Sequence, residues 1–279
     1  MIIIVRLSLK NILNLNKVFS SKNMIENNGG ITGNNDDFDK GPSFIVTESS
    51  QILLGSIEDI LADLISRVDL CPADYEFYDK FRCILDLYDR FQREVIDASK
   101  ISIVCSAGCS SCCCHWVDDV NSFEGMIISR YLADNHPDII NSVIKSFRKD
   151  AEALTSLQVL IDEKIAEYSN VSDDIPDNHE FLLSCFYQLE RPCALLDDSG
   201  RCLVYPVRPL TCRDYLNLRD PAACLPELIN EEERATLIMY LSNTVSDRLE
   251  ILHRRFDQGN NDMSLRTLLV RFLEVGECN

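Results

Sequence analysis

The sequence predicts a mainly α fold: a helical domain in which an irregular, cysteine-rich metal-binding loop region ties two distant segments together. From Phe44 onward, apolar residues recur at three- and four-residue steps, the period of an amphipathic helix. No stretch alternates apolar and polar residues as a half-buried strand does. The helical period stops between Arg191 and Pro226, where prolines, cysteines and arginines replace it. Something other than an apolar core must therefore order this region.

The first 43 residues differ in composition from the rest. Residues 27–42, "NNGGITGNNDDFDKGP", are rich in Asn, Gly and Asp and cannot bury enough apolar surface to order themselves. The first 25 residues carry four basic side chains and no acidic one. We interpret this segment either as an organelle transit segment or, preferably, as an over-long start that precedes the true initiator at Met24. We predict a flexible segment over 1–43 and one helical domain over 44–279 that contains the cysteine-cluster region 104–224.

The expected helices follow one another in order. Residues 56–68 and 72–98 carry apolar stripes, and we assign the aromatic stripe of the second to core packing. Ser122 is the expected N-cap of a helix over 122–135. A long or broken helix over 138–168 follows, then a short apolar segment of undecided type over 180–190. Helices over 231–256 and 263–275 close the chain.

Charge and hydropathy exclude two classes of partner. The net charge is −18, from 27 basic and 45 acidic residues, and such a chain would be repelled by nucleic acid phosphates. No apolar run approaches the roughly 18 residues that a membrane span needs. The chain also carries no convincing secretory signal. We therefore expect a cytoplasmic protein that binds neither nucleic acid nor a membrane.

Eight of the 13 cysteines fall into two groups. The groups are about 80 residues apart, and their members are Cys105, Cys109, Cys112 and Cys113, then Cys193, Cys202, Cys212 and Cys224. Disulfide bonds are a less favoured explanation, because they would need an oxidising compartment and because an odd number of cysteines leaves at least one unpaired. Free thiols in a core would lie on an apolar stripe, as we expect for Cys83 and Cys185, rather than among Ser, Gly and Ala.

Metal binding is the explanation that the cysteine pattern favours. Thiolates are soft, charged donors for zinc, iron and iron–sulfur clusters, and Gly108 eases the turn that would bring neighbouring sulfurs together. Eight thiolates exceed the four that one tetrahedral ion uses. We therefore expect both groups to close on one compact site with more than one metal ion. Iron or an iron–sulfur cluster is the first choice, and zinc is the alternative.

These residues resemble a known family. The first group, followed far downstream by "CLVYPVRPLTCR" and a last cysteine, is similar to the YkgJ-type CxxCxxCC cysteine-cluster family, a zinc- or iron-chelating domain. The resemblance covers about 104–224 and implies the eight clustered cysteines as metal ligands. One relative, the flagellin lysine N-methylase, looks like an enzyme built around an iron–sulfur centre. The resemblance therefore implies two alternatives: a metalloenzyme that modifies a peptide or protein, or a structural zinc site in an interaction or metal-handling protein.

Several residues near the cysteines are candidates for supporting roles. Arg208 and Arg213 flank Cys212, where they would donate hydrogen bonds to thiolates, hold an anionic substrate, or pair with an acid. Tyr205 would hydrogen-bond near the site or fill space beside it. Cys114 and His115 extend the first group, and a histidine is a legitimate metal donor. We expect the other three histidines, His136, His179 and His253, on the surface.

Overall fold

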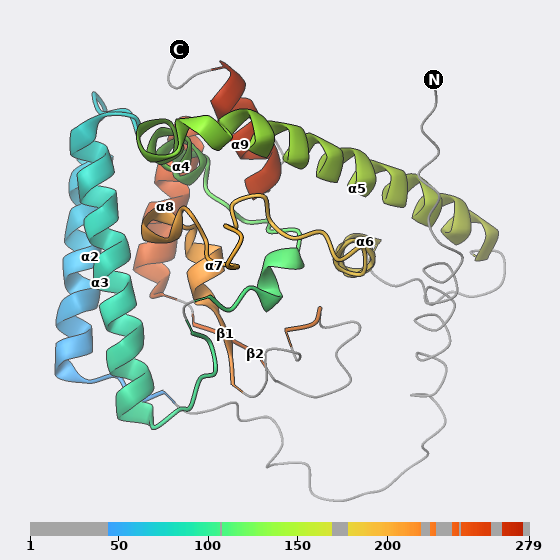
Figure 1. Cartoon of the computed structure of the whole chain (residues 1–279). Coiled ribbons are helices and arrows are strands. Elements are labelled where there is room, and N and C mark those ends of the chain that lie inside the picture. Colours follow the sequence, from blue (N-terminus) through green and yellow to red (C-terminus); the bar gives the residue numbers. More distant parts are fainter. Residues whose placement is uncertain are drawn as a thin grey trace, which may run out of the picture.

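The computed structural model describes residues 44–106, 108–168, 178–218, 224–226, 236–239, 241–257 and 264–275. These residues are mainly helical, as predicted (Figure 1). The flexible segment expected over 1–43 lies outside the described residues. No helix among the described residues combines the length and apolarity needed to cross a membrane.

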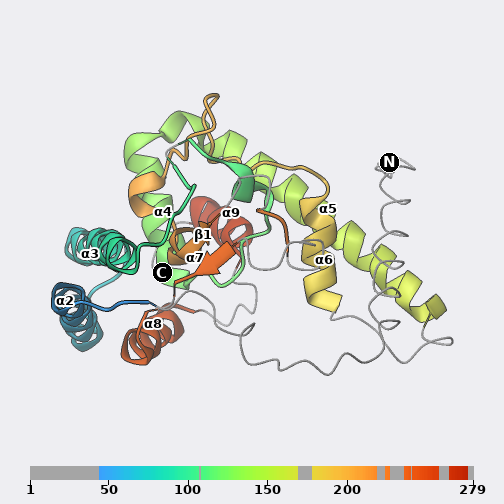
Figure 2. The same cartoon turned by 90° about the horizontal axis from the view of Figure 1, so that it is seen from below.

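A hairpin of two helices forms one side of the structure. Helix α2 (Glu48–Ser66) runs beside α3 (Tyr75–Ser99), and α8 (Asn243–Phe256) packs against α2, as the view along these helices shows (Figure 2). The predicted aromatic stripe is buried: the ring of Phe77 lies 5.7 Å from that of Phe256 and 6.2 Å from that of Phe123. The stripe therefore serves core packing, which confirms the prediction.

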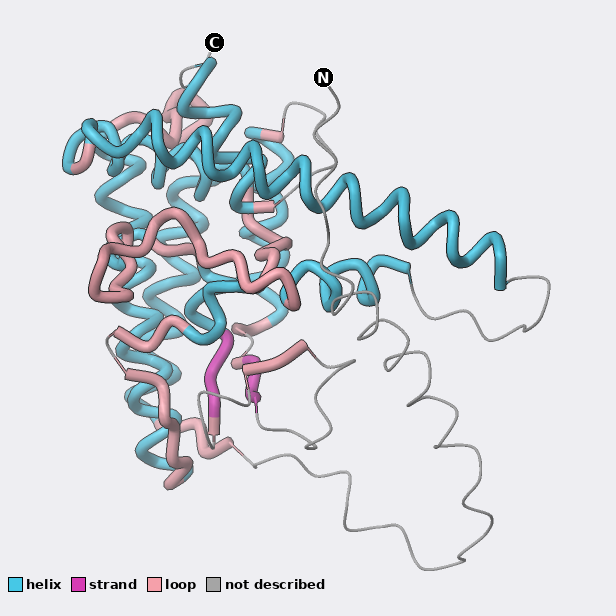
Figure 3. The backbone as a smooth tube through the Cα atoms, turned by 45° about the vertical axis from the view of Figure 1, so that its right-hand side comes forward, coloured by secondary structure: helices cyan, strands magenta, loops and turns pink. Residues whose placement is uncertain are grey.

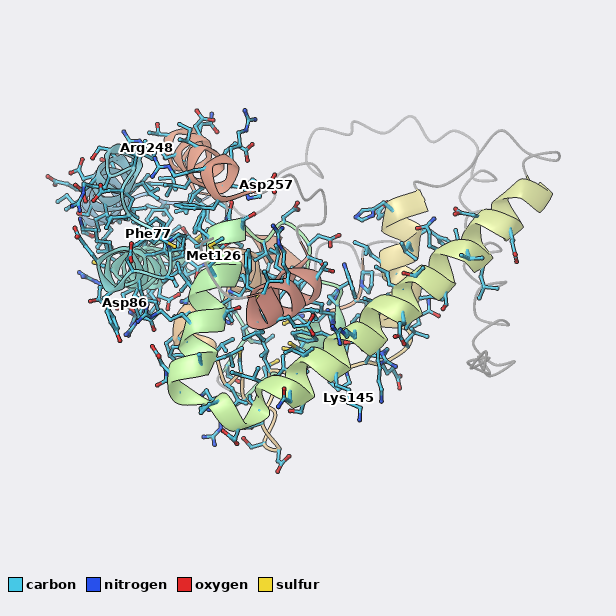
Figure 4. The ribbon with its side chains drawn as sticks, turned by 90° about the horizontal axis from the view of Figure 1, so that it is seen from above. Phe77, Asp86, Met126, Lys145, Arg248 and Asp257 are labelled. Carbon is cyan, nitrogen blue, oxygen red and sulfur yellow. The ribbon has the colours of Figure 1, made fainter. Side chains whose placement is uncertain are left out.

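A second group of helices packs on this hairpin. Helix α4 (Ser122–Asn135) leads through the 3₁₀ turn η3 (Pro137–Ile139) into the long α5 (Ile140–Tyr168), and α9 (Leu265–Val275) packs on both. In Figure 4, Phe77 and Met126 lie where α3 meets α4, whereas Asp86 and Lys145 point outward. A Cβ at Gly125 would lie 3.0 Å from the ring of Phe272, so α4 and α9 approach closely.

Helix α6 (Asn178–Tyr187) settles the undecided segment as helical and packs against α5. Apolar residues of α5 and α6 form a second cluster around Trp116, whose ring meets that of Phe186 edge to face at 5.0 Å. This cluster includes Cys185, which is buried as expected. Trp116 thus anchors the end of the first cysteine segment between two helices.

Four local predictions are wrong. The helix expected over 231–256 begins only at Asn243, and β2 (Thr236–Ile238) precedes it, paired antiparallel with β1 (Tyr215–Asn217). The cap of α4 is Asn121 rather than Ser122, because the side chain of Glu124, three residues on, closes a capping box with Asn121. Cys83 is exposed, and His253 is buried and accepts a hydrogen bond from the backbone N–H of Ser122 at 3.1 Å.

Candidate functional site

Several loops of the described chain lie near the two strands (Figure 3). They enclose a cavity of about 750 Å³. All eight cysteines of the two groups line it: Cys105, Cys109, Cys112, Cys113, Cys193, Cys202, Cys212 and Cys224. Helix α3, helix α7 (Leu210–Asp214), β1 and the start of α9 complete its wall. The structure therefore brings both groups to one place, although they are far apart in the sequence.

The first cysteine segment is shaped by a glycine and a single 3₁₀ turn. Gly108 has φ +89°, a left-handed conformation that suits glycine. The turn η2 (Ser111–Cys114) follows, with the N–H of Cys113 donating to the carbonyl of Ser110 at 2.9 Å. Successive side chains of a 3₁₀ turn point in different directions. As a result, Cys112 and Cys113 line the cavity and Cys114 does not.

The second cysteine segment has more core than the sequence predicts. Its chain reverses at Asp197, whose carboxylate accepts from the N–H groups of Ser199 and Arg201, and Gly200 takes φ +78°. The region also sends five apolar side chains into the main core: Leu195, Val204, Val207, Leu210 and Leu216. The expectation that something other than an apolar core must order this region is therefore wrong in part.

Backbone hydrogen bonds join the two segments directly. The N–H of Cys193 donates to the carbonyl of Cys113 at 2.9 Å, and the N–H of Val104 donates to the carbonyl of Asn217 at 2.9 Å. A Cβ at Gly200 would lie 3.5 Å from the carbonyl oxygen of Gly108, so the two turns also touch. The two cysteine groups thus belong to one hydrogen-bonded unit.

Asn217 is a site residue that sequence reasoning missed. Its backbone N–H donates to Sγ of Cys105 at 3.2 Å, and its side-chain amide donates to Sγ of Cys224 at 3.0 Å. The residue is 1% exposed. One buried residue therefore donates to a sulfur of each group, through its backbone N–H and its side-chain amide.

Arg213 forms an ion pair with an acid, which was one of the three roles predicted for it. Its Nη1 donates to both carboxylate oxygens of Asp89 at 2.6 Å, and its Nε donates to the carbonyl of Arg208 at 3.1 Å. Its Nη2 donates to the carbonyls of Tyr205 and Pro206, each at 3.1 Å. These contacts use all five N–H groups of the guanidinium. Arg213 lines the cavity, but all its donors bind Asp89 and the loop that carries Arg208.

Arg208 and Tyr205 also line the cavity. The guanidinium carbon of Arg208 lies 4.3 Å from the centre of the Tyr205 ring, a cation–π contact, and the ring is 47% exposed. The Nε of Arg208 is buried and has no hydrogen-bond partner among the described residues. Unlike Arg213, Arg208 therefore keeps a donor free at the cavity.

A further arginine that lines the cavity, Arg266 on α9, was not among the predicted site residues. It is 1% exposed and lines the cavity. Its Nε donates to Asp150 at 3.0 Å and its Nη1 to the carbonyl of His115 at 2.8 Å. Its Nη2 is buried without a partner in the described part of the chain. The only sequence signal is an arginine beside the apolar stripe of a helix.

The two residues that extend the first group take different positions. Cys114 lies outside the cavity wall, whereas His115 lines it. The His115 ring shares a 3.0 Å hydrogen bond with the carbonyl of Cys224 and packs 4.5 Å from the Tyr187 ring. Burial lowers the pKa of His115, so its imidazole tends to be neutral. The ring therefore joins the first group to the last cysteine of the second.

The thiols of the cavity influence one another. Burial raises the pKa of Cys202 to about 11 and also raises that of Cys212, with neighbouring sulfurs adding to both shifts. A hydrogen bond between Cys112 and Cys113 lowers the pKa of Cys112 to about 7 and raises that of Cys113. Without cations, most of these groups therefore favour the neutral thiol. No three Cys, His, Asp or Glu side chains in the described ranges already stand as a formed set of metal ligands.

Comparison with known proteins adds no family to this geometry. No protein-family model, no curated protein and no solved structure matches the chain.

Proposed function

We propose that the chain is a metal-binding protein whose two cysteine groups together hold iron, preferably in an iron–sulfur centre, or zinc. The observation that carries this is the convergence of all eight cysteines on one cavity. Thiolates are the donors that these metals share. The resemblance to the YkgJ-type family at 104–224 supports the same ligand set.

Metal binding also accounts for an otherwise unfavourable arrangement. Eight sulfurs around one cavity can ionise together only if cations offset their mutual repulsion. Cysteine must lose its proton to bind, so metal uptake would release protons and draw the thiols inward into a ligand set. The number of thiols favours more than one ion, because a tetrahedral ion takes four.

A second hypothesis is that the centre is catalytic. A cavity of about 750 Å³ falls within the size range of pockets for small molecules, which is roughly 300–1,000 Å³. It would leave room for part of a substrate beside the metal, as a peptide- or protein-modifying enzyme requires. A purely structural zinc site would not need this space.

The test of the proposed function is metal analysis of matched variants. The protein would be made with iron and purified without air, then examined by elemental analysis, acid-labile sulfide assay and Mössbauer spectroscopy. We expect iron and sulfide in wild type, and less of both in Cys212→Ser. Cys83→Ser, which alters an exposed cysteine that does not line the cavity, is the control and should keep the wild-type content.

The outcomes separate the alternatives. Colourless protein with stoichiometric zinc would leave a metal site and remove the iron–sulfur version. Unchanged metal content in Cys212→Ser would show that the second group does not bind. If the wild-type protein contains no bound metal, the proposed function is wrong.

A further inference from the structure

Two arginines bring unpaired donors to the cysteine cavity. Arg208 Nε and Arg266 Nη2 are both buried and lack a hydrogen-bond partner among the described residues. Both side chains line the cavity. Three other buried polar atoms in the described chain also lack partners, on Arg82, Ser129 and Arg130, but none of these residues lines it. A buried N–H without an acceptor costs free energy, so these two donors favour an occupant that accepts hydrogen bonds.

Charge around Arg266 also favours a negative occupant. Asp150 is 2% exposed and accepts from Arg266 on one oxygen and from Arg191 on the other, at 3.0 and 2.5 Å. One carboxylate thus faces two guanidinium groups, so the triad carries one net positive charge, which Arg191 at 34% exposure shares with solvent. Buried charges in proteins are normally paired. Arg266 is also fixed by the rings of Trp116 and Phe186, at 5.2 and 5.1 Å, so it cannot swing out to solvent.

Both arginines share the wall of one cavity with all eight cysteines of the two groups. The acceptors that an occupant formed by these groups would offer to the two arginines are therefore sulfur atoms. Neutral thiols are weak acceptors, whereas thiolates and sulfide are anionic and accept well.

We propose that Arg208 and Arg266 are hydrogen-bond donors to the sulfur atoms of an anionic metal–sulfur centre in this cavity and supply part of its counter-charge. This inference rests on the proposed function and adds two residues other than cysteine to the proposed metal site. A thiolate-rich centre is negative because its thiolates outnumber the positive charges of its ions. Hydrogen bonds to the sulfurs and local charge set the stability and reduction potential of such a centre. Arg266 lies on α9, outside the segment that resembles the family.

The test compares two variants with two matched controls. Arg208→Gln and Arg266→Gln remove the charges at the cavity. Arg82→Gln is the control for the first, because Arg82 also has an unpartnered Nε and a tyrosine ring beneath it, but lies outside the cavity. Arg255→Gln is the control for the second, because Arg255 is also partly buried and donates to backbone carbonyls, but does not line the cavity. Circular dichroism would establish that each variant is folded.

The main measurement is the half-time for transfer of bound metal to an excess of chelator without air. We expect the metal to leave both cavity variants about tenfold faster than wild type. The controls should stay near wild type, and Arg266→Lys, which keeps the charge, should fall between. If the metal is iron, the oxidised-to-reduced ratio at a fixed potential should also rise about tenfold in Arg266→Gln, equivalent to 59 mV for one electron.

Each outcome decides the inference. Wild-type half-times in both cavity variants would overturn it while leaving the proposed function intact. Equal acceleration in the controls would assign the effect to general destabilisation and overturn it as well. Wild type without bound metal would remove the proposed function first and this inference with it.

Discussion

The side-chain amide of Asn217 donates a hydrogen bond to Sγ of Cys224 across 3.0 Å, while its backbone N–H donates to Sγ of Cys105. We predict that Asn217→Asp, which keeps the shape but replaces the donor with a negative acceptor, weakens metal binding by about 100-fold, since partners of metal ligands carry effects of this size. Competition with a chromogenic chelator would measure it. Asn135→Asp, at an exposed asparagine of α4, should bind metal as wild type does. Equal affinity of the two variants would contradict a supporting role for Asn217.

Asp150 is predicted to matter for folding whether or not metal is present. Asp150→Asn leaves the buried guanidinium of Arg266 without its counter-ion, which should cost about 3 kcal/mol in the free energy of unfolding. Urea denaturation would measure the loss. Glu250→Gln instead breaks an exposed pair with Arg254 and should cost under about 0.5 kcal/mol. A similarly small effect at Asp150 would show that the triad does not depend on its charge.

Asp214 should make stability depend on pH. Burial raises its pKa from 3.8 to about 7. Tyr88 lies within hydrogen-bond distance of both Asp214 and the carbonyl of Met239, yet has one hydroxyl proton to give. A protonated Asp214 can donate to Tyr88, which then donates to Met239.

The sign of this pH effect follows from linkage. The folded state holds the proton more tightly than the unfolded state, so the stabilisation is complete below pH 3.8 and is lost as the pH rises through about 7. Asp214→Asn mimics the protonated group. Its free energy of unfolding should exceed that of wild type by roughly 1–3 kcal/mol at pH 8, a range reduced for the partial exposure of Asp214, and should equal it at pH 4. Urea midpoints from pH 4 to 8 would test this. Parallel profiles for variant and wild type would be the contrary result.

Gly200 should resist substitution because of its conformation. Its φ of +78° is strained for any residue with a Cβ, and that Cβ would lie 3.4 Å from Oγ of Ser110 in the other cysteine segment. Gly200→Ala should therefore destabilise the protein by about 1–2 kcal/mol. Gly55→Ala is the matched control: it lies in α2 with open space around it and should gain about 0.8–1 kcal/mol. Thermal unfolding of both variants would check the opposite signs.

The helices could be predicted because burial imposes a period on the sequence. The stripe of Phe77, Phe81 and Leu85 can be recognised in the sequence for this reason, and all three residues are buried in the core. The strands could not be predicted, since three residues are too few to show alternation. The cap of α4 could have been predicted correctly: Asn121 has a glutamate three residues later, and Ser122 does not.

The cavity was partly foreseeable as well. The grouping of the cysteines, together with the resemblance at 104–224, indicated the eight thiols that line one cavity. Asn217 and Arg266 gave no such signal, since their roles depend on tertiary contacts with residues far away in the sequence, Cys105 and His115. His253 looked like a surface residue for the same reason: only the start of α4 makes it a buried acceptor.

The separation of the two cysteine groups has a consequence for biosynthesis. A ribosome adds about 110 residues between Cys113 and Cys224. At typical elongation rates of about 5–20 residues per second, the first four thiols are exposed for on the order of ten seconds before the last is made. During that time the nascent chain offers an incomplete, reactive set to oxidants and to any passing ion. In the proposed function, all eight thiols would be available to metal only after Cys224 has been made, so assembly of the whole centre would follow the synthesis of both groups.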